Sequence, residues 1–419
     1  MKKREAQNPL KDIRSSRGHE LDGRKIVLCV TGSVASIEVP ALAREMMRHG
    51  ADVHVVMSEA AEKLVRPDAL QWATGNPVVR KLTGETEHVW LAGEWEGRAH
   101  MVVIAPCTAN TVSKIALGID DTPVTTVASM AMGSGIPLMI CPAAHEPMYR
   151  NPSVQVNISS LEAKGVVFVG PKYEEGKAKM ASVDEIVSAV IRKQTRQDFR
   201  GKRVLVSGGP TVEFIDPVRV ITNLSSGKMG LSLAKEAWRR GADVSYVYGG
   251  SLRPPAEIKS IRIETTSEMR KAVMAELAKG RYDVFISAAA PADFTPVHPA
   301  RTKVPTRDGE LKISLKPTPK IVEGVKKAWP KLYVAAFKAE TTHSKRELTI
   351  AMKKLRERGG VDMVVGNMVG GSRGFGADSN SVLILGKRAI KGTGERPKHE
   401  VAEAILDEIA ADMKRSSRS

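Results

Sequence analysis

Short apolar runs alternate with amphipathic helical stretches along most of this 419-residue chain. In its first part, KIVLCV (Lys25–Val30) and MVVIA (Met101–Ala105) have the length of strands, and a helical pattern over Ile37–His49 lies between them. Strands of a parallel sheet read as apolar runs because helices cover both faces of the sheet. The sequence therefore predicts an α/β fold built on mostly parallel sheets.

A second series of the same kind begins at Arg203 and resembles the first. GRKIVLCVTG (residues 23–32) matches GKRVLVSGG (201–209), and RHGADVHVV (48–56) matches RRGADVSYV (239–247). Because such a repeat indicates two units of one design, we predict two Rossmann-like domains. The expected divisions are a disordered basic tail at 1–22, a first domain at 23–194, a charged linker at 195–202, a second domain at 203–413 and a tail at 414–419.

The apolar runs and the cysteines favour a cytoplasmic protein. No run reaches the about 20 residues that cross a bilayer, and the basic N-terminal stretch has no apolar segment behind it. The cysteines, Cys29, Cys107 and Cys141, are odd in number, lack metal-ligand spacing and lie in or beside apolar runs. We therefore expect reduced, mostly buried thiols and no membrane span.

The formal charge of +17 would suit a nucleic-acid-binding protein. Only 4% of the residues are aromatic, however, and no helix-turn-helix, zinc-finger or RNP signature is found. The charge is also compatible with a solvated basic surface or with small anionic ligands, and we expect no nucleic-acid partner.

TNLSSGKMG (Thr222–Gly230) looks like a phosphate-binding loop but does not follow the Walker A pattern. That pattern needs Gly where Thr222 stands and Ser or Thr where Met229 stands. The loop is extra length in the second repeat, at the carboxyl end of a strand, where ligands of open α/β sheets bind. Gly227 and Gly230 permit close backbone approach, and Asn223 offers both donor and acceptor. The alternative is a surface loop with an N-cap at Ser225 or Ser226.

Two turns of the first series end strands in a similar way. VTGSVAS (Val30–Ser36) lacks GxGxxG, which leaves a single phosphate held by Gly32, Ser33, Ser36 and backbone amides. APCTANT (Ala105–Thr111) is a second turn of small residues. The alternative for both is ordinary helix capping.

The order of motifs resembles one known family. It comprises TGSVAS, EHVWLA, APCTANT, PAAHEPMYRNP, DPVRVITNLSSGKMG, AAAPADF and GFGADSN. In this order they resemble the bifunctional phosphopantothenoylcysteine decarboxylases and phosphopantothenate–cysteine ligases of coenzyme A synthesis. The resemblance covers Gly23 to about Ile409, and DPVRVITNLSSGKMG is its most specific part.

For the first domain the resemblance implies a flavodoxin-like, FMN-dependent decarboxylase. His88 matches the catalytic histidine and His145 a substrate-binding position, where many bacterial members have Asn. The flavin-contacting positions are Gly32, Ser33, Ser58, Thr108 and Asn110. Bacterial members also carry a proton-donating Cys on a mobile flap, and GPKYEEGKAKMAS (Gly170–Ser182) has none. Glu174, Glu175, Lys177, Lys179 or water could replace it, and Glu175 is our candidate.

For the second domain the resemblance implies a nucleotide-binding ligase that uses CTP, usually with Mg²⁺, to form an acyl cytidylate. Asn223 and Arg219 match positions that handle phosphopantothenate and this intermediate. The matching CTP positions are Ser287, Ala288, Ala289, Asp293, Lys303, Pro319, Lys320, Ile321, Val322, Phe337 and Lys353. The metal ligands are not indicated.

The resemblance further implies a homo-oligomer, a dodecamer in this family. Three alternatives stay open: only the ligase half is active, the chain is a nicotinamide-dependent oxidoreductase, or it is a basic nucleic-acid-binding protein.

Overall fold

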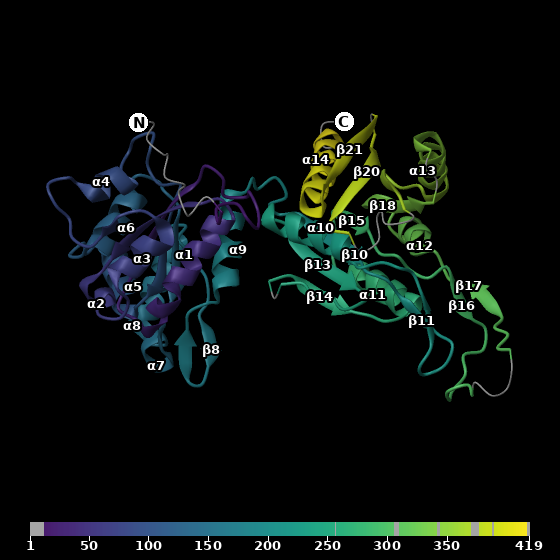
Figure 1. The fold of residues 1–419 in the computed structure, drawn as a ribbon, viewed down its shortest axis with the longest axis horizontal. Coiled ribbons are helices and arrows are strands. Elements are labelled where there is room, and N and C mark those ends of the chain that lie inside the picture. Colours follow the sequence, from purple (N-terminus) through teal and green to yellow (C-terminus); the bar gives the residue numbers. More distant parts are fainter. Residues whose placement is uncertain are drawn as a thin grey trace, which may run out of the picture. The chain divides into compact units, whose positions relative to one another are not determined.

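The chain divides into two compact units, Met1–Thr195 and Arg196–Ser419, which Figure 1 shows in purple through blue to blue-green and in teal to yellow. The computed structural model describes residues 12–255, 257–305, 310–341, 344–369, 377–387 and 389–416. Each unit has its own sheet with helices on both faces. The predicted α/β class, with two Rossmann-like units, is confirmed.

The first unit contains a parallel sheet with strand order β3-β2-β1-β4-β5-β7. The strands are β1 Lys25–Val30, β2 Asp52–Met57, β3 Val78–Val79, β4 Met101–Cys107, β5 Leu138–Pro142 and β7 Val167–Phe168. Alternate residues of β1 enter two different cores, Ile26 and Leu28 on one face and Val27 and Cys29 on the other. The apolar run of β1 is thus explained by burial on both sides.

Helices of the first unit cover both faces of this sheet. The first face packs against α1 Val39–Arg48, α3 Pro67–Thr74 and α9 Val183–Gln194. The second face packs against α4 Glu87–Ala92, α5 Ala109–Leu117, α6 Pro123–Gly133 and α8 Pro152–Ala163. Shorter elements are η1 Val34–Glu38, α2 Glu59–Glu62, α7 Glu146–Tyr149 and an antiparallel sheet of β6 Ala144–His145, β9 Lys177–Lys179 and β8 Lys172–Glu174.

The expected disordered tail at 1–22 is wrong for the residues from Asp12 onward, while residues 1–11 lie outside the described ones. Leu21 is fully buried in the first core. The N–H groups of Ser15 and Leu21 donate to the carbonyls of Met47 and His49 at 3.0 and 2.8 Å. The buried Leu21 side chain and these backbone hydrogen bonds together fix the segment to the end of α1.

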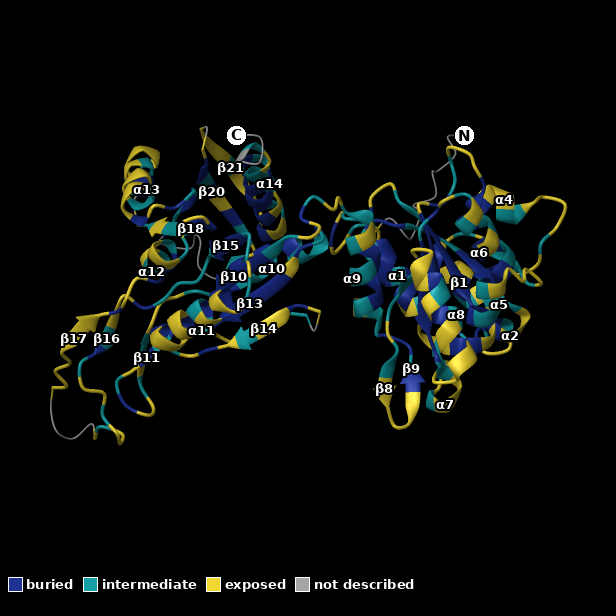
Figure 2. Ribbon diagram, turned by 180° about the vertical axis from the view of Figure 1, so that it is seen from behind, coloured by how far each residue is buried: buried dark blue, intermediate teal, exposed yellow. Residues whose placement is uncertain are grey.

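The second unit contains a larger sheet with strand order β14-β13-β10-β15-β18-β19-β20-β21. It is parallel as far as β19, and β20 and β21 are antiparallel. The strands are β10 Arg203–Gly208, β13 Asp243–Tyr248, β14 Lys259–Arg262, β15 Val284–Ser287, β18 Tyr333–Glu340, β19 Met363–Met368, β20 Ser379–Leu385 and β21 Ile390–Pro397. Figure 2 shows β10, β13 and β15 in the dark blue of buried residues.

Two groups of helices cover the second sheet. One face packs against α10 Lys228–Arg239 and α14 Lys398–Ser416, and the other against α11 Thr266–Ala278, α12 Ile321–Ala328 and α13 Lys345–Gly359. Two antiparallel hairpins leave this layered body: β11 Val212–Phe214 with β12 Val220–Thr222, and β16 Phe294–Pro296 with β17 Leu315–Pro317. Each residue of β17 is exposed (Figure 2).

The expected linker at 195–202 is wrong for most of its length, because these residues pack into the second unit. Phe199 is 1% exposed in that unit's core. The Asp198 carboxylate accepts a hydrogen bond from Arg240 Nε at 2.8 Å, and the Asp407 carboxylate accepts another from the Arg240 guanidinium at 2.8 Å. Arg240 is fully buried, so these carboxylates are its counter-ions. The expected tail at 414–419 is also shorter than predicted, because α14 continues to Ser416.

Candidate active sites

In the first unit, the strand order reverses at β1, which lies between β2 and β4. Ligands of open α/β sheets bind at such a point, beyond the carboxyl ends of the strands. Thr31, just after β1, donates from Oγ1 to the carbonyl of Pro106 at 2.8 Å and accepts from the N–H of Thr108 at 3.1 Å. These bonds hold the two predicted turns side by side.

Small residues and helix starts line this edge. A Cβ on Gly32 would lie 2.5 Å from the Cβ of Ala60, so only glycine fits there. Ser33, Ser58 and Thr108 each cap a helix start by accepting a backbone N–H. Capping is therefore confirmed as one role of these side chains. The other N–H groups of the helix starts stay at the edge, so the turns suit a phosphate-bearing group such as a flavin mononucleotide. Asn110 is exposed in the first turn of α5.

The two predicted histidines lie on other elements. His88 is on α4, which packs against α6. Its Nδ1 is buried and has no hydrogen-bond partner among the described residues. Because a buried polar atom without a partner is costly, this nitrogen is suited to a group that arrives with a ligand. His145 is exposed on β6 and pairs with Lys177 of β9.

The segment Gly170–Ser182 forms the β8–β9 hairpin, which is joined to the strand that carries His145. Glu175 lies at its turn with φ of 53°. Lys179 Nζ is 3.0 Å from the Glu175 carboxylate and 3.1 Å from that of Glu174. The hydrogen bond from Lys179 and its charge lower the pKa of Glu175. Glu175 is therefore ionised near neutral pH, which weakens the candidate proton donor.

The switch point of the second unit lies at β10, between β13 and β15, and repeats the design of the first. The N–H of Ala288 donates to the carbonyl of Ser207 at 3.0 Å, and that of Ala290 to Gly209 at 2.9 Å. Thr211 Oγ1 accepts the N–H of Ala292 at 2.9 Å, as Thr31 accepts that of Thr108 in the first unit. A threonine hydroxyl thus fastens the two turns in each unit, although Thr211 lies two positions beyond the residue that matches Thr31 in the repeat.

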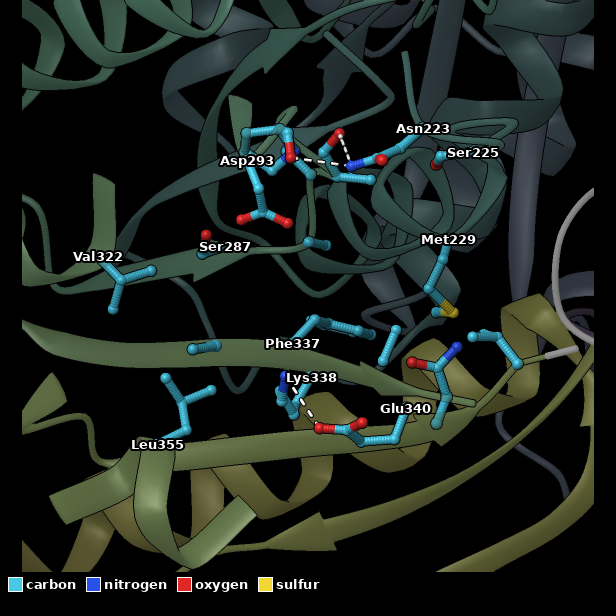
Figure 3. Close-up of a pocket in the computed structure, with 18 of the residues that line it drawn as sticks. Asn223, Ser225, Met229, Ser287, Asp293, Val322, Phe337, Lys338, Glu340 and Leu355 are labelled. Carbon is cyan, nitrogen blue, oxygen red and sulfur yellow. Dashed lines mark hydrogen bonds and ion pairs between the residues drawn. The ribbon is translucent and has the colours of Figure 1, made fainter. Parts of the chain in front are cut away.

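A cavity of about 1270 Å³ opens at this switch point (Figure 3). The inserted loop, the turn after β15, the start of α12, the end of β18 and one side of α13 line it. Most predicted ligase residues meet here: Asn223, Ser287, Ala288, Ala289, Asp293, Pro319, Lys320, Ile321, Val322 and Phe337. Within the cavity, Lys320 Nζ lies 2.5 Å from Asp293 Oδ1.

Glycines let the inserted loop approach the switch point. Gly227 is the N-cap of α10 with φ of 75°, so the alternative N-cap at Ser225 or Ser226 is wrong. A Cβ on Gly230 would lie 2.7 Å from the Cα of Gly208. Gly227 and Gly230 thus let α10 pack closely against the turn after β10, while their predicted approach to a ligand stays a prediction.

Arg219 supports the inserted loop and is not among the described cavity-lining residues. Its guanidinium donates to Asp216 at 2.7 Å and to the carbonyl of Val304 at 2.9 Å. Burial raises the pKa of the fully buried Asp216, but the N–H groups of Val218, Arg219 and Val304 outweigh it and hold the pKa at about 2. The Asp216–Arg219 pair therefore fixes the turn of the β11–β12 hairpin.

Two predicted lysines are also absent from the lining among the described residues. Lys303 is exposed on the β16–β17 connection, and Lys353 is exposed on α13. Lys354 and Arg358 line the cavity instead, one helical turn apart on α13. Their i, i+4 spacing in an amphipathic helix is the signal that could have identified them.

The described residues contain no group of three or more His, Cys, Asp or Glu placed to hold a metal ion. Cys29, Cys107 and Cys141 are free and buried, as predicted, and burial raises the pKa of each thiol. No described helix has the length and apolar character needed to span a membrane. Of the GFGADSN motif, Gly374–Gly376 lie outside the described residues, while Asp378 and Asn380 are described.

Comparison with known proteins shows the family to which both units belong. The profile of the family described as Flavoprotein matches residues 14–195, and that of the DNA/pantothenate metabolism flavoprotein C-terminal domain matches residues 199–413. The chain is 48% identical over 401 residues to the coenzyme A biosynthesis bifunctional protein CoaBC of Thermococcus kodakarensis, covering 96% of this chain and 98% of the relative. Its identity to the CoaBC of Methanocaldococcus jannaschii is 37% over 97% of this chain and 98% of the relative, and to that of Escherichia coli 33% over 95% and 99%. The resemblance drawn from the motifs is confirmed, and the chain belongs to the family of coenzyme A biosynthesis bifunctional proteins.

Proposed function

We propose that this chain catalyses two consecutive steps of coenzyme A synthesis. The first is CTP-dependent ligation of cysteine to 4'-phosphopantothenate, and the second is FMN-dependent decarboxylation of the product to 4'-phosphopantetheine. The observation that carries the proposal is that one chain holds two switch-point sites of the same design, within a family match that covers both units.

In the ligase site, cationic side chains line the cavity in which the phosphates of CTP and the substrate carboxylate would bind. A substrate carboxylate attacks the α-phosphorus of CTP and pyrophosphate leaves; the amine of cysteine then attacks the acyl carbon and CMP leaves. Lys320, Lys354 and Arg358 line the cavity and would stabilise the phosphate charge. Mg²⁺ is expected to accompany the nucleotide, with Asp293 as a candidate contact. Asn223, on the loop opposite Asp293, would hold the activated carboxyl group (Figure 3).

The side-chain amide of Asn223 donates hydrogen bonds to two backbone carbonyls, and a substrate oxygen could compete with them for these N–H groups. Its Nδ2 contacts the carbonyls of Pro291 at 2.9 Å and Ala290 at 3.3 Å. Both acceptors belong to cavity-lining residues, so these bonds hold the amide in the cavity wall. Arg219 would act on this loop indirectly by holding Asp216, and Lys303 would have to reach the substrate from the exposed β16–β17 connection.

In the decarboxylase site, the turns at Gly32, Ser33 and Thr108 would hold the phosphate of FMN, with Ser58 and Asn110 beside them. A bound flavin supplies reversible two-electron oxidation of the substrate's cysteine portion, which makes loss of the carboxylate feasible. His88, with its buried unpartnered Nδ1, would hold the proton of the substrate thiol. His145 would donate a hydrogen bond to the departing carboxylate.

Two features favour a second candidate, in which only the ligase half turns over. The β8–β9 hairpin has no cysteine, and its Glu175 is held ionised by Lys179. We nevertheless propose the complete sequence, with water or a hairpin side chain as the last proton donor. A cytoplasmic homo-oligomer, with the dodecamer as the family's assembly, completes the proposal.

The test incubates the purified full chain with 4'-phosphopantothenate, cysteine, CTP and Mg²⁺. Mass spectrometry should detect both the cysteine adduct and 4'-phosphopantetheine, and the protein should show flavin absorbance. Detection of the cysteine adduct without 4'-phosphopantetheine would mean that only the ligase half is active. A colourless protein that cannot be loaded with FMN and consumes no nucleotide would overturn the proposal.

A further inference from the structure

Two helices of the second unit begin at the same end of the ligase cavity. Their first residues, Lys228 of α10 and Lys398 of α14, both line it. The helices run in the same direction, because Arg240 at the end of α10 contacts Asp407, well along α14. Both helices therefore turn their positive N-terminal ends toward one place in the cavity wall.

Lys398 carries an ammonium group that is largely withdrawn from water. The residue is 6% exposed, and its Nζ donates to the carbonyl of Ala377. Burial lowers its pKa, the charge of Lys228 lowers it further, and Asp378 acts in the opposite direction. Lys228 and Lys398 therefore bring two ammonium groups close to one another at the starts of two helices.

The side chain of Asp378, which pairs with Lys228, is weakly held. Its Oδ1 lies 2.6 Å from Lys228 Nζ, yet its side chain is 93% exposed. Its backbone carbonyl accepts the N–H of Lys398 at 3.0 Å, which keeps the residue beside both lysines. An exposed ion pair of this kind contributes little stability, so a stronger anion can replace its carboxylate.

We propose that Lys228 and Lys398 form a phosphate subsite of the ligase cavity, and that the Asp378 carboxylate occupies it until a substrate phosphate displaces it. The ligand class is a phosphate or pyrophosphate group. It could come from the outer phosphates of the nucleotide, and hence the pyrophosphate product, or from the phosphate of 4'-phosphopantothenate. This assignment rests on the proposed ligase function for its natural ligand.

The displacement gives the subsite a distinctive property. Removing the charge of Lys398 weakens phosphate binding, whereas removing the charge of Asp378 strengthens it. Loss of folding could imitate the first effect but not the second. Because the Asp378 side chain is almost fully exposed, Asp378→Asn removes the carboxylate that competes with phosphate for Lys228 and leaves the core packing unchanged.

The experiment titrates inorganic pyrophosphate, CTP, CMP, 4'-phosphopantothenate and pantothenate into the full chain by calorimetry. We expect Lys398→Met to weaken pyrophosphate binding by about tenfold and Asp378→Asn to strengthen it by about threefold. Lys271→Met, which removes an exposed charge on α11 outside the cavity lining, is the matched control and should bind as the wild type does.

The paired ligands identify the source of the phosphate. A loss in Lys398→Met for CTP but not CMP assigns the subsite to the outer phosphates of the nucleotide. A loss for 4'-phosphopantothenate but not pantothenate assigns it to the other substrate. If the wild type binds no CTP, the proposed nucleotide use fails while the pyrophosphate result still tests the subsite. If Lys398→Met and Asp378→Asn bind every phosphate ligand as the wild type does, the subsite is overturned.

Discussion

The side-chain amide of Asn223 donates a hydrogen bond to the carbonyl oxygen of Pro291 at 2.9 Å. This bond ties the loop inserted after β10 to the turn after β15, in the lining of the cavity (Figure 3). The loop and the turn therefore present their polar groups to a ligand as one surface.

Asn223→Asp should abolish most ligase activity. A carboxylate cannot donate to the carbonyls of Pro291 and Ala290 and would be repelled by both. We expect adduct formation from phosphopantothenate, cysteine and CTP to fall by about 100-fold. Decarboxylation of supplied phosphopantothenoylcysteine, measured on the same preparation, should be unchanged; a parallel loss of both activities would indicate a folding effect instead.

Gly230→Ala should destabilise the second unit. The added Cβ would lie 2.7 Å from the Cα of Gly208, so α10 must move away from β10. We expect a cost of about 1–3 kcal/mol in unfolding free energy, measured by chemical denaturation. Gly324→Ala on α12 is the matched control, because a Cβ there meets no atom within 4 Å. Equal effects of the two substitutions would contradict the close approach.

The turn of the β11–β12 hairpin should loosen in acid. The pKa of Asp216 is depressed from 3.8 to about 2, so its contribution to stability is present above 3.8 and is lost as the pH falls toward 2. Amide protection of Val218 and Arg219, followed by hydrogen exchange, should decline over this window. In Asp216→Asn the protection should already be low at pH 6, and a pH-independent wild type would refute the assignment.

Glu236→Gln should stabilise the second unit at alkaline pH. Burial raises the pKa of Glu236 from 4.5 to about 7, although Arg239 and Arg240 oppose the shift. A raised carboxyl pKa gives stability that is present below 4.5 and is lost as the pH rises toward 7. The variant should therefore gain on the order of 1 kcal/mol over the wild type between pH 4 and pH 8. The exposed Glu357→Gln serves as control and should show no such gain in the same denaturation series.

The decarboxylase half offers a pair of substitutions with opposite expectations. His88→Gln should reduce decarboxylation by about 100-fold or more, since a buried nitrogen suited to the substrate's proton is replaced. Glu175→Gln should stay within about twofold, because Lys179 already keeps this carboxylate from acting as an acid. Accumulation of a decarboxylated but unreduced product in Glu175→Gln would instead make Glu175 the proton donor.

Burial on both faces explains why the main strands could be predicted from sequence. The runs that form β1, β4 and β15 are apolar at nearly every position, and β10 has the apolar run Val204–Val206, because helices cover these strands on two sides. The β16–β17 hairpin has no such signal, since β17 is exposed throughout. Leu21 was missed for a related reason, because one apolar residue among charged ones has no periodicity.

The residues of the candidate site could likewise be predicted only where the fold fixes their position. Asn223 and Asp293 lie in strand-end turns whose position follows from the fold, and both line the cavity. Lys353 is not among the described cavity-lining residues, whereas Lys354 is, because a shift of one position on a helix turns a side chain by about 100°. The pairing of Arg219 with Asp216 depends on the hairpin that the loop forms, which no local pattern of the sequence specifies.

The clamp of Asp198 on Arg240 determines where this polypeptide could be divided into two separately produced enzymes. A cut placed after the charged stretch, at the first strand of the second unit, would remove Asp198 and Phe199 and leave a fully buried guanidinium with part of its compensation missing. Removing one partner of a buried pair typically costs about 3–5 kcal/mol, comparable to the whole margin of many domains. A separately produced ligase must therefore begin at or before Arg196, because the charged stretch before β10 is needed for the stability of the second unit.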